Sequence, residues 1–469
     1  MTQRNRPFGW RDKVGYLFGD FGNDFTFILS TSILMKFYTD VVGLTSGLVG
    51  LVMMVARLLD AVTDVTMGRI ADAGRPTKAG KFRPWILRMA VPVAAASFLM
   101  YQSGIAGLPY GFRVGYFVVT YLLWGSFCYT GINIPYGSMA SGISPEPADR
   151  QSLSTYRSMG GTLAGLVIGV VLPIFAYQKV TLPDGAVKET LIGSRVTAIA
   201  GIFSVLAVIC YLLCYYLVQE RIQYQPVQKE KTSFFKLFAD AVRNKPLISI
   251  ITASILMLLA QLTMQNMSAY LFPDYYNNAG AQSVASVLMV IGMLLAAVAA
   301  KPLAARFGKA EVAAVSNVFA ALVCLVIFFV RPQSVWVYCG LQFLNWVGLG
   351  IFSMVSWALI TDVIDDAELK NGIREDGSIY ALYSFARKLG QAAASGLSGL
   401  LLQAIGYNNN AISQGVPQTE EVKAGIFNIA TLMPAVGFAA LAAVLWFWYP
   451  LRKARVESNV AALKEKHGS

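Results

Sequence analysis

Residues 55–64 read VARLLDAVTD and lie inside a long apolar stretch, SGLVGLVMMVARLLDAVTDVTMG, that covers residues 46–68. A helix needs about 20 residues to cross a membrane, so this stretch is long enough. It nevertheless carries Arg57, Asp60 and Asp64 within three turns. A charge near the centre of a bilayer costs roughly a few kcal/mol. A partner must compensate these charges, or the protein must use them.

The chain as a whole has the composition of a polytopic membrane protein. Of its 469 residues, 56% are hydrophobic and 14% are charged, and the mean hydropathy is +0.54. Soluble domains carry about 25% charged residues. The only histidine is His467, and the five cysteines fall in apolar segments without the spacing of metal ligands. We therefore expect no enzyme activity, no cofactor and no disulfide framework.

Apolar segments of transmembrane length recur along the chain, and they predict an all-α membrane protein with twelve spanning helices. The predicted ranges are 14–38, 46–71, 84–104, 112–141, 152–177, 194–219, 246–272, 282–303, 311–330, 334–364, 376–405 and 424–449.

Lysines and arginines are concentrated in the loops on one side of these spans. The loops of the opposite side hold only Arg113, Lys179, Lys188, Arg331 and Lys423. Because basic loops mark the cytoplasmic side, we expect both termini in the cytoplasm. The net charge of +12 is then an orientation signal, and we expect contact with membrane lipid and no nucleic-acid partner.

One long polar connection divides the chain into two six-helix halves. We expect an N-terminal bundle at 1–219, a cytoplasmic middle loop at 220–245, and a C-terminal bundle with a short tail at 246–469. The halves resemble each other, because YRSMGGTLAG in the fifth span corresponds to FARKLGQAAASG in the eleventh. Repeated halves are typical of secondary transporters.

Polar residues from several spans fall at similar depths. At a rise of 1.5 Å per residue, Asp24, Asp60 and Lys388 lie roughly 15–18 Å from the predicted inner ends of their helices. Asn133 and Arg157 lie at roughly 8–12 Å. Transporter sites are found near this depth, close to the midplane of the bilayer.

The acids of the second span allow two interpretations. Residues three, four or seven apart share a helix face, so Arg57, Asp60 and Asp64 form one stripe. The two carboxylates are suited to hold a sodium ion, with Thr63 as a further ligand, or to hold a proton. Alternatively, Arg57 and Asp60 form a purely structural ion pair, although one basic residue cannot neutralise the four acids of the first two spans.

Six motifs resemble one known family. They are GDFGNDF at 19–25, FYTDVVGLTSGLVG at 37–50, VARLLDAVTD at 55–64, GKFRPWIL at 80–87, NIPYGSM at 133–139 and WALITDVIDDAELKNGIREDGSIYALYSFARKLGQA at 357–392. In this order they are similar to the glycoside–pentoside–hexuronide:cation symporters of the major facilitator superfamily. The resemblance implies the major facilitator fold and a bacterial inner membrane.

The resemblance, together with the polar and aromatic residues of the spans, implies roles for individual side chains. The cation-binding residues are Asp60, Asp64, Thr63 and Thr130, and Asp60 and Asp64 would be metal ligands if the ion is Na⁺. The substrate-binding residues are Asp24, Tyr129, Asn133, Arg157, Gln261, Tyr383 and Lys388. The gating and coupling residues are Asp20, Arg57, Asp72, Arg374 and Arg387.

Four positions depart from the pattern of the melibiose-carrying members of that family, and one of them is Thr63, which stands where they have an asparagine and bears on the choice of ion. The other three bear on the sugar. Asn23 stands where they have a lysine, and Asn133 and Gly137 stand where they have an acid and a tryptophan that face the sugar. The loss of that tryptophan removes a stacking surface, so the departure predicts a different sugar.

These features predict a symporter that takes up a sugar or glycoside with Na⁺ or H⁺ by alternating access. A neutral β-linked glycoside or pentoside is favoured, followed by a hexuronide. The alternative is a cation-coupled carrier of lysolipid or another amphiphile in the same superfamily, but Gln261, Gln265, Asn266 and Asn345 favour a polar cavity. We expect a monomer whose partners are the sugar and the coupling cation.

Overall fold

The structure is a computed structural model, and it describes residues 6–181, 185, 187–222, 244–371 and 376–468. By their contacts the residues form two compact units. Unit 1 comprises Met1–Gln228 with Leu402–Gln418, and unit 2 comprises Lys229–Leu401 with Thr419–Ser469. The expected boundaries at 1–219, 220–245 and 246–469 stay a prediction, and residues 223–243 of the middle loop lie outside the described residues.

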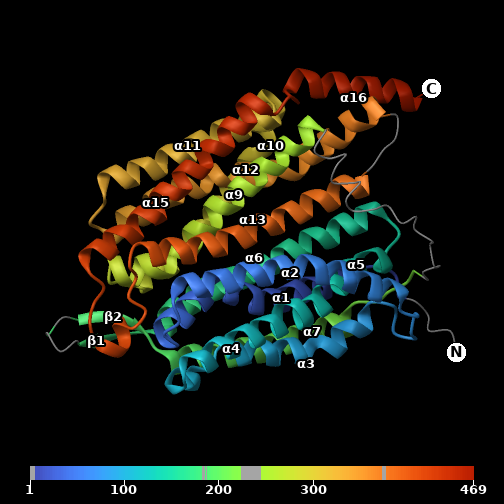
Figure 1. Cartoon of the computed structure of the whole chain (residues 1–469). Coiled ribbons are helices and arrows are strands. Elements are labelled where there is room, and N and C mark those ends of the chain that lie inside the picture. The colour runs from blue at the N-terminus through green and yellow to red at the C-terminus, as the bar shows by residue number, and fades with distance from the viewer. Residues whose placement is uncertain (1–5, 182–184, 186, 223–243, 372–375, 469) are drawn as a thin grey trace. The chain divides into compact units, whose positions relative to one another are not determined.

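Long helices occupy the apolar ranges of unit 1 (Figure 1). They are α1 (Trp10–Lys36), α2 (Ser46–Ala73), α3 (Arg83–Met100), α4 (Tyr110–Leu122), α5 (Thr130–Ile143), α6 (Pro147–Ala176) and α7 (Gly193–Leu217). A π-helical segment, η3 (Leu123–Tyr129), joins α4 to α5 without a break. Helix α1 packs against both α6 and α7, while α2 and α3 pack against the η3–α5 region.

Glycines allow the close approach of α1 to its neighbours. A Cβ atom at Gly19 would lie 2.2 Å from the ring of Tyr136, so only glycine leaves room for that ring. A Cβ atom at Gly160 of α6 would lie 2.4 Å from the backbone oxygen of Leu17. Small residues at such contacts let membrane helices pack closely, where lipid removes most of the hydrophobic driving force.

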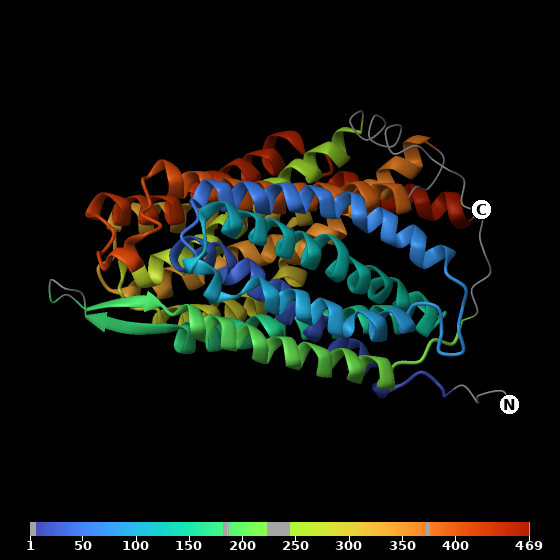
Figure 2. The same ribbon diagram turned by 60° about the horizontal axis from the view of Figure 1, so that its bottom comes forward.

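A short hairpin joins α6 to α7. Strand β1 (Tyr177–Thr181) pairs antiparallel with β2 (Val187–Leu191), with Tyr177 opposite Leu191. Figures 1 and 2 both show the hairpin beyond the helix ends, at the end of unit 1 that is opposite the N-terminus. If the N-terminus is cytoplasmic, the hairpin is external, and this orientation stays a prediction.

Two acids connect separate segments of the chain at the end of unit 1 that lies near the N-terminus. Asp12 is fully buried and forms ion pairs of 2.9 Å with Arg6 and 2.8 Å with Arg221. The Glu220 carboxylate accepts hydrogen bonds from the backbone N–H groups of residues 81–83, at 2.6–2.9 Å. Burial raises the pKa of Glu220, although these N–H groups oppose the shift. The segment after α7 is thereby tied to the start of α3.

The long helices of unit 2 likewise occupy its apolar ranges. They are α9 (Lys245–Tyr270), α10 (Gly280–Phe307), α11 (Lys309–Val330), α12 (Val335–Asn371), α13 (Asp376–Ala404, of which the last turn belongs to unit 1) and α15 (Glu420–Ala443). A further helix, α16 (Lys453–Gly468), is polar and follows the last apolar range. Helix α12 packs against α10 and α11, and α15 packs against α9 and α11.

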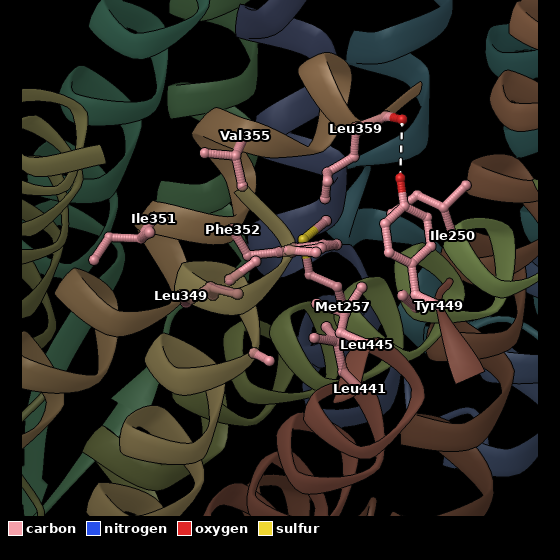
Figure 3. Packing of buried hydrophobic residues seen from close by; sticks show 14 of the residues in the cluster. Ile250, Met257, Leu349, Ile351, Phe352, Val355, Leu359, Leu441, Leu445 and Tyr449 are labelled. Atoms are coloured by element: carbon pink, nitrogen blue, oxygen red, sulfur yellow. Dashed lines mark hydrogen bonds between the residues drawn. The ribbon is translucent and has the colours of Figure 1, made fainter. Parts of the chain in front are cut away.

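The core of unit 2 is a continuous apolar cluster (Figure 3). Phe352 lies near its centre and is fully buried, with Met257 of α9 and Leu445 around it. Tyr449 closes one side, where its hydroxyl donates a hydrogen bond of 3.3 Å to the backbone oxygen of Leu359. The phenol therefore buries its ring without leaving its hydroxyl group unsatisfied.

Nine helical stretches of the described residues are long and apolar enough to span a membrane. Three further long helices, α1, α2 and α13, do not meet that criterion. These helices carry Asp24, Asp60 and Lys388, and such charges lower the mean hydropathy of a helix. That all twelve helices span the membrane, with both termini in the cytoplasm, stays a prediction.

Candidate functional site

The two acids of VARLLDAVTD lie on α2 opposite η3 and the start of α5. Asp60 Oδ1 accepts a hydrogen bond of 2.6 Å from the Ser126 hydroxyl, and Asp64 Oδ1 accepts one of 2.8 Å from the Thr130 hydroxyl. On each side the two residues are about one turn apart, so the pairs lie one above the other between the same helices. Carboxylate and hydroxyl oxygens can bind a hard cation, and the carboxylates can also bind a proton.

The π-helical segment brings backbone atoms close to these acids. A Cβ atom at Gly125 would lie 3.5 Å from both carboxylate oxygens of Asp60, within ordinary contact. The Thr130 hydroxyl also lies 3.1 Å from the backbone oxygen of Gly125. The hydrogen of Thr130 therefore has two acceptors within reach, Asp64 Oδ1 and the backbone oxygen of Gly125. Wide turns of this kind are frequent at functional sites.

Arg57 is buried beside Asp60. Its Nη1 lies 3.6 Å from Asp60 Oδ2, and its guanidinium group lies 4.7 Å from the ring centroid of Phe27 and 5.8 Å from that of Trp124. The ion pair considered from the sequence is therefore present in this structure. It involves one oxygen of Asp60 while Ser126 binds the other, so both contacts orient the same carboxylate.

Two further hydroxyls lie beside these acids, and the sequence predicts only that of Thr63 as a ligand; its role stays a prediction. Thr63 was predicted to be a cation ligand, and its hydroxyl donates to the backbone oxygen of Asp60 on its own helix at 3.2 Å. Ser126 was not predicted, although it contacts Asp60 directly. Its signal was its position four residues before Thr130, which places both hydroxyls on nearly one face of a helix.

A second polar cluster lies between α1 and α6. Arg157 Nε donates a hydrogen bond of 2.9 Å to Asp20 Oδ1. A Cβ atom at Gly161 would lie 2.5 Å from Asp24 Oδ2 and 3.2 Å from Asp20 Oδ2. The missing side chain therefore makes room for both carboxylates on the face of α6 that carries Arg157.

Aromatic and amide groups extend this cluster toward α5 and α7. The Arg157 guanidinium group lies 5.2 Å from the ring centroid of Tyr136. Asn23 donates a hydrogen bond of 3.4 Å to Asn133 and accepts one of 2.9 Å from Tyr211. Asn23 was noted only as a departure from a family motif, whereas here it links three helices.

The remaining predicted residues of unit 1 have structural contacts. Tyr129 is half-buried and stacks on Phe27, with their ring centroids 5.5 Å apart. The backbone oxygen of Asp72 accepts a hydrogen bond of 2.7 Å from Lys81 Nζ.

In unit 2, Gln261 and Lys388 are half-buried, on α9 and α13. Tyr383 is fully buried, and its hydroxyl lies 2.7 Å from the Ser254 hydroxyl. The guanidinium group of Arg387 lies over two aromatic rings of the same unit. Arg374 lies outside the described residues, so its predicted role in gating has no structural account.

The model of a protein family described as MFS/sugar transport protein matches residues 15–453. The chain belongs to this family. The sequence resemblance to the glycoside–pentoside–hexuronide symporters is thereby confirmed. A member of this sugar-transport family is a multi-pass membrane transporter and not an enzyme, as predicted. The family description does not favour the lysolipid alternative.

Individual relatives cover nearly the whole chain. The uncharacterized symporter YjmB of Bacillus subtilis (strain 168) is 30% identical over 97% of this chain and 95% of its own length. The glucuronide carrier protein homolog of Escherichia coli (strain K12) is 29% identical over 98% of this chain and 97% of its own length. A mutant of the nucleoside transporter NupG has the same fold, with a TM-score of 0.66 and 13% identity over 94% of this chain and 100% of that chain.

Proposed function

We propose that this member of the sugar-transport family is a cation-coupled symporter of a bacterial inner membrane. It takes up a sugar or glycoside by alternating access, together with Na⁺ or H⁺. The observation that carries the proposal is the pair of hydrogen bonds from Ser126 to Asp60 and from Thr130 to Asp64. Two acids and two hydroxyls, arranged as two pairs one above the other between the same helices, are a suitable ligand set for a small cation.

The sugar would bind to the polar cluster of α1 and α6. Asp24 can accept hydrogen bonds from sugar hydroxyls, while Arg157 and Asn133 can donate them. In unit 2 we propose three further substrate ligands. Lys388 is proposed from the sequence resemblance, and Gln261 and Tyr383 are proposed as polar and aromatic residues of the predicted spans.

A chain of contacts offers a route for coupling between cation and sugar. Arg57 contacts both Asp60 and the ring of Phe27, and Phe27 lies three residues after Asp24 on the same face of α1. A change of charge at Asp60 therefore acts on the helix that would hold the sugar. A coupling free energy of ~1–3 kcal/mol between the two ligands is sufficient for useful cooperation.

The experiment measures external pH in a lightly buffered suspension of de-energised cells that express the protein. Glycosides are added one at a time, with and without sodium. Alkalinisation without sodium identifies a proton-coupled substrate, whereas uptake that needs sodium and moves no protons identifies Na⁺ as the coupling ion. Asp60→Asn is expected to abolish accumulation of that substrate against a gradient. If the variant still accumulates it, the cation assignment is wrong.

Asp149→Asn is the matched control. Asp149 lies in the first turn of α6 and accepts a hydrogen bond of 2.6 Å from Ser144, which is the same contact that Ser126 makes with Asp60. This variant changes the same chemistry away from the proposed cation site. It is therefore expected to accumulate substrate as the unmodified protein does.

A further inference from the structure

Arg387 lies on a rigid aromatic platform within unit 2. It is the twelfth residue of α13, roughly 16 Å along the helix at 1.5 Å per residue. Its guanidinium group lies 5.8 Å from the ring centroid of Trp357 and 5.9 Å from that of Tyr383. The two rings meet edge to face, with centroids 5.1 Å apart, and the hydroxyl of Tyr383 is held by Ser254. These contacts fix the position of the Arg387 guanidinium group.

Two other arginines in the long helices contact both aromatic rings and a carboxylate. Arg57 has aromatic rings and the carboxylate of Asp60 at 3.6 Å. Arg157 has an aromatic ring and the carboxylate of Asp20 at 2.9 Å. Arg387 has the rings, but no carboxylate among the described residues contacts its guanidinium group.

Two acids of the neighbouring helix α12 are paired with lysines. Asp362 is paired with Lys309 at 2.5 Å, and Asp366 is paired with Lys370 at 2.5 Å. Both acids are almost fully buried in these pairs. A charged side chain at membrane depth normally pairs with a group of opposite charge, and aromatic rings compensate it only in part. Arg387 is thus a charged side chain held beside aromatic rings, with no carboxylate of the described residues to pair with it.

We propose that Arg387 binds an acidic group on the substrate, a carboxylate or a sulfonate, and thereby selects acidic sugars over neutral ones. The inference rests on the proposed function as a sugar symporter. The planar guanidinium group matches such anions with two parallel hydrogen bonds. The ring of Trp357 is 44% exposed beside it and offers a surface for the sugar itself. This role replaces the coupling role that sequence position suggested for Arg387.

The test compares sugars that differ only in the acidic group. Methyl β-D-glucuronide, the corresponding 6-sulfonate and methyl β-D-glucoside are offered to the purified full-length protein, and binding is measured by calorimetry. We expect the unmodified protein to bind at least one acidic sugar at least tenfold more tightly than the glucoside. In Arg387→Gln this preference is expected to disappear, while Arg387→Lys keeps part of it. The carboxylate and the sulfonate are distinguished by which of the two binds more tightly.

Arg88→Gln serves as the matched control, because Arg88 also lies over an aromatic ring, that of Trp85, at 5.9 Å but on the exposed surface of unit 1. It is expected to keep the preference for the acidic sugar. Equal binding of glucoside and glucuronide by the unmodified protein would overturn the role of Arg387 and leave sugar transport intact. So would equal weakening of both sugars in an Arg387→Gln variant that melts at the normal temperature. If cells expressing the protein take up none of a wide glycoside panel, the proposed function itself fails.

Discussion

In unit 1, α2 packs against η3 and α5, and in unit 2, α10 packs against α12. The two contacts differ in their chemistry. In unit 1, α2 presents Asp60 and Asp64 to the hydroxyl groups of η3 and α5. In unit 2, α10 meets α12 through small residues, and a Cβ atom at Gly350 would lie 2.6 Å from the Cβ of Ala296. Glycine and alanine bring two helices together without burying charge, whereas each acid in a membrane costs roughly a few kcal/mol.

This difference distinguishes residues that helix packing requires from residues that function requires. If close packing of these helices were the only requirement, small apolar residues would satisfy it in unit 1 as they do in unit 2. The acids of α2 are therefore not explained by packing. The proposed coupling cation would explain them, because it would bind to this helix pair of unit 1 and not to the corresponding pair of unit 2.

The largest effect on stability is expected when the acid of α2 that contacts Arg57 and Ser126 is replaced by an apolar residue. Asp60→Leu leaves Arg57 buried without its acid, and removing one partner of a buried ion pair costs ~3–5 kcal/mol of stability. Thermal unfolding in detergent measures this loss. The double variant Arg57→Met, Asp60→Leu is expected to recover most of the stability and still fail to accumulate sugar. Accumulation by the double variant would reduce the pair to a structural role.

An intermediate effect is expected when the contact of unit 2 is enlarged. Gly350→Leu forces a side chain against Ala296, and overpacking of this kind costs ~1–3 kcal/mol in the free energy of unfolding. Gly340→Ala on the same helix is the control, because nothing lies within 4 Å of its Cβ position. Replacing that helical glycine is expected to stabilise by ~0.5–1 kcal/mol. If the two variants unfold alike, α10 and α12 are less closely packed than described.

A third charged pair of unit 1 is expected to serve stability alone, in contrast to the acids of α2. Lys36 and Asp40 form an ion pair of 2.8 Å, with exposed fractions of only 2% and 7%. The Tyr407 hydroxyl lies 3.1 Å from Lys36 Nζ and 2.9 Å from Asp40 Oδ1. Tyr407→Phe is expected to lower the free energy of unfolding by ~1–2 kcal/mol with an unchanged accumulation ratio. A large fall in that ratio would give the pair a part in transport.

The smallest effects are expected from the hydroxyls of the cation site. Thr130→Val removes a direct hydrogen bond to Asp64. It is expected to weaken binding of the coupling cation about tenfold, or ~1.4 kcal/mol. Thr63→Val removes a hydroxyl that bonds to its own helix backbone, so we expect a change within about twofold. The half-saturating concentration of the coupling cation in uptake assays measures both. The opposite ranking would make Thr63 the ligand, as the sequence suggested.

Much of this site was accessible from local sequence patterns. The apolar ranges predicted where the long helices lie, and the spacing of Asp60 and Asp64 predicted that they share a face. The depth of Asp20 and Arg157 placed them at a similar level, but only the structure shows that they form an ion pair. Depth along a helix follows from counting residues, whereas pairing also depends on how each helix is rotated.

Other contacts had little or no local signal. Tyr407 is separated from Lys36 by 371 positions, and no periodicity connects them. For Ser126 the spacing of four residues from Thr130 was only a weak signal, because Ser126 lies in the π-helical segment, where the wider turn shifts residues around the helix. Asn23 is a substitution in a motif, and its partners Asn133 and Tyr211 come from two other helices.

By itself, the sequence determined that this protein is a helical membrane transporter and which helices carry charge, because hydropathy and helical spacing are local properties of the chain. Which charge meets which partner is visible only in the folded protein. Asp60 contacts both an arginine and a serine, Asp20 contacts Arg157, and Arg387 lies over two rings with no acid of the described part of the chain beside it. The physical reason is that hydrogen bonds and ion pairs act over a few ångströms in space. Whether two distant residues come that close depends on how whole helices pack.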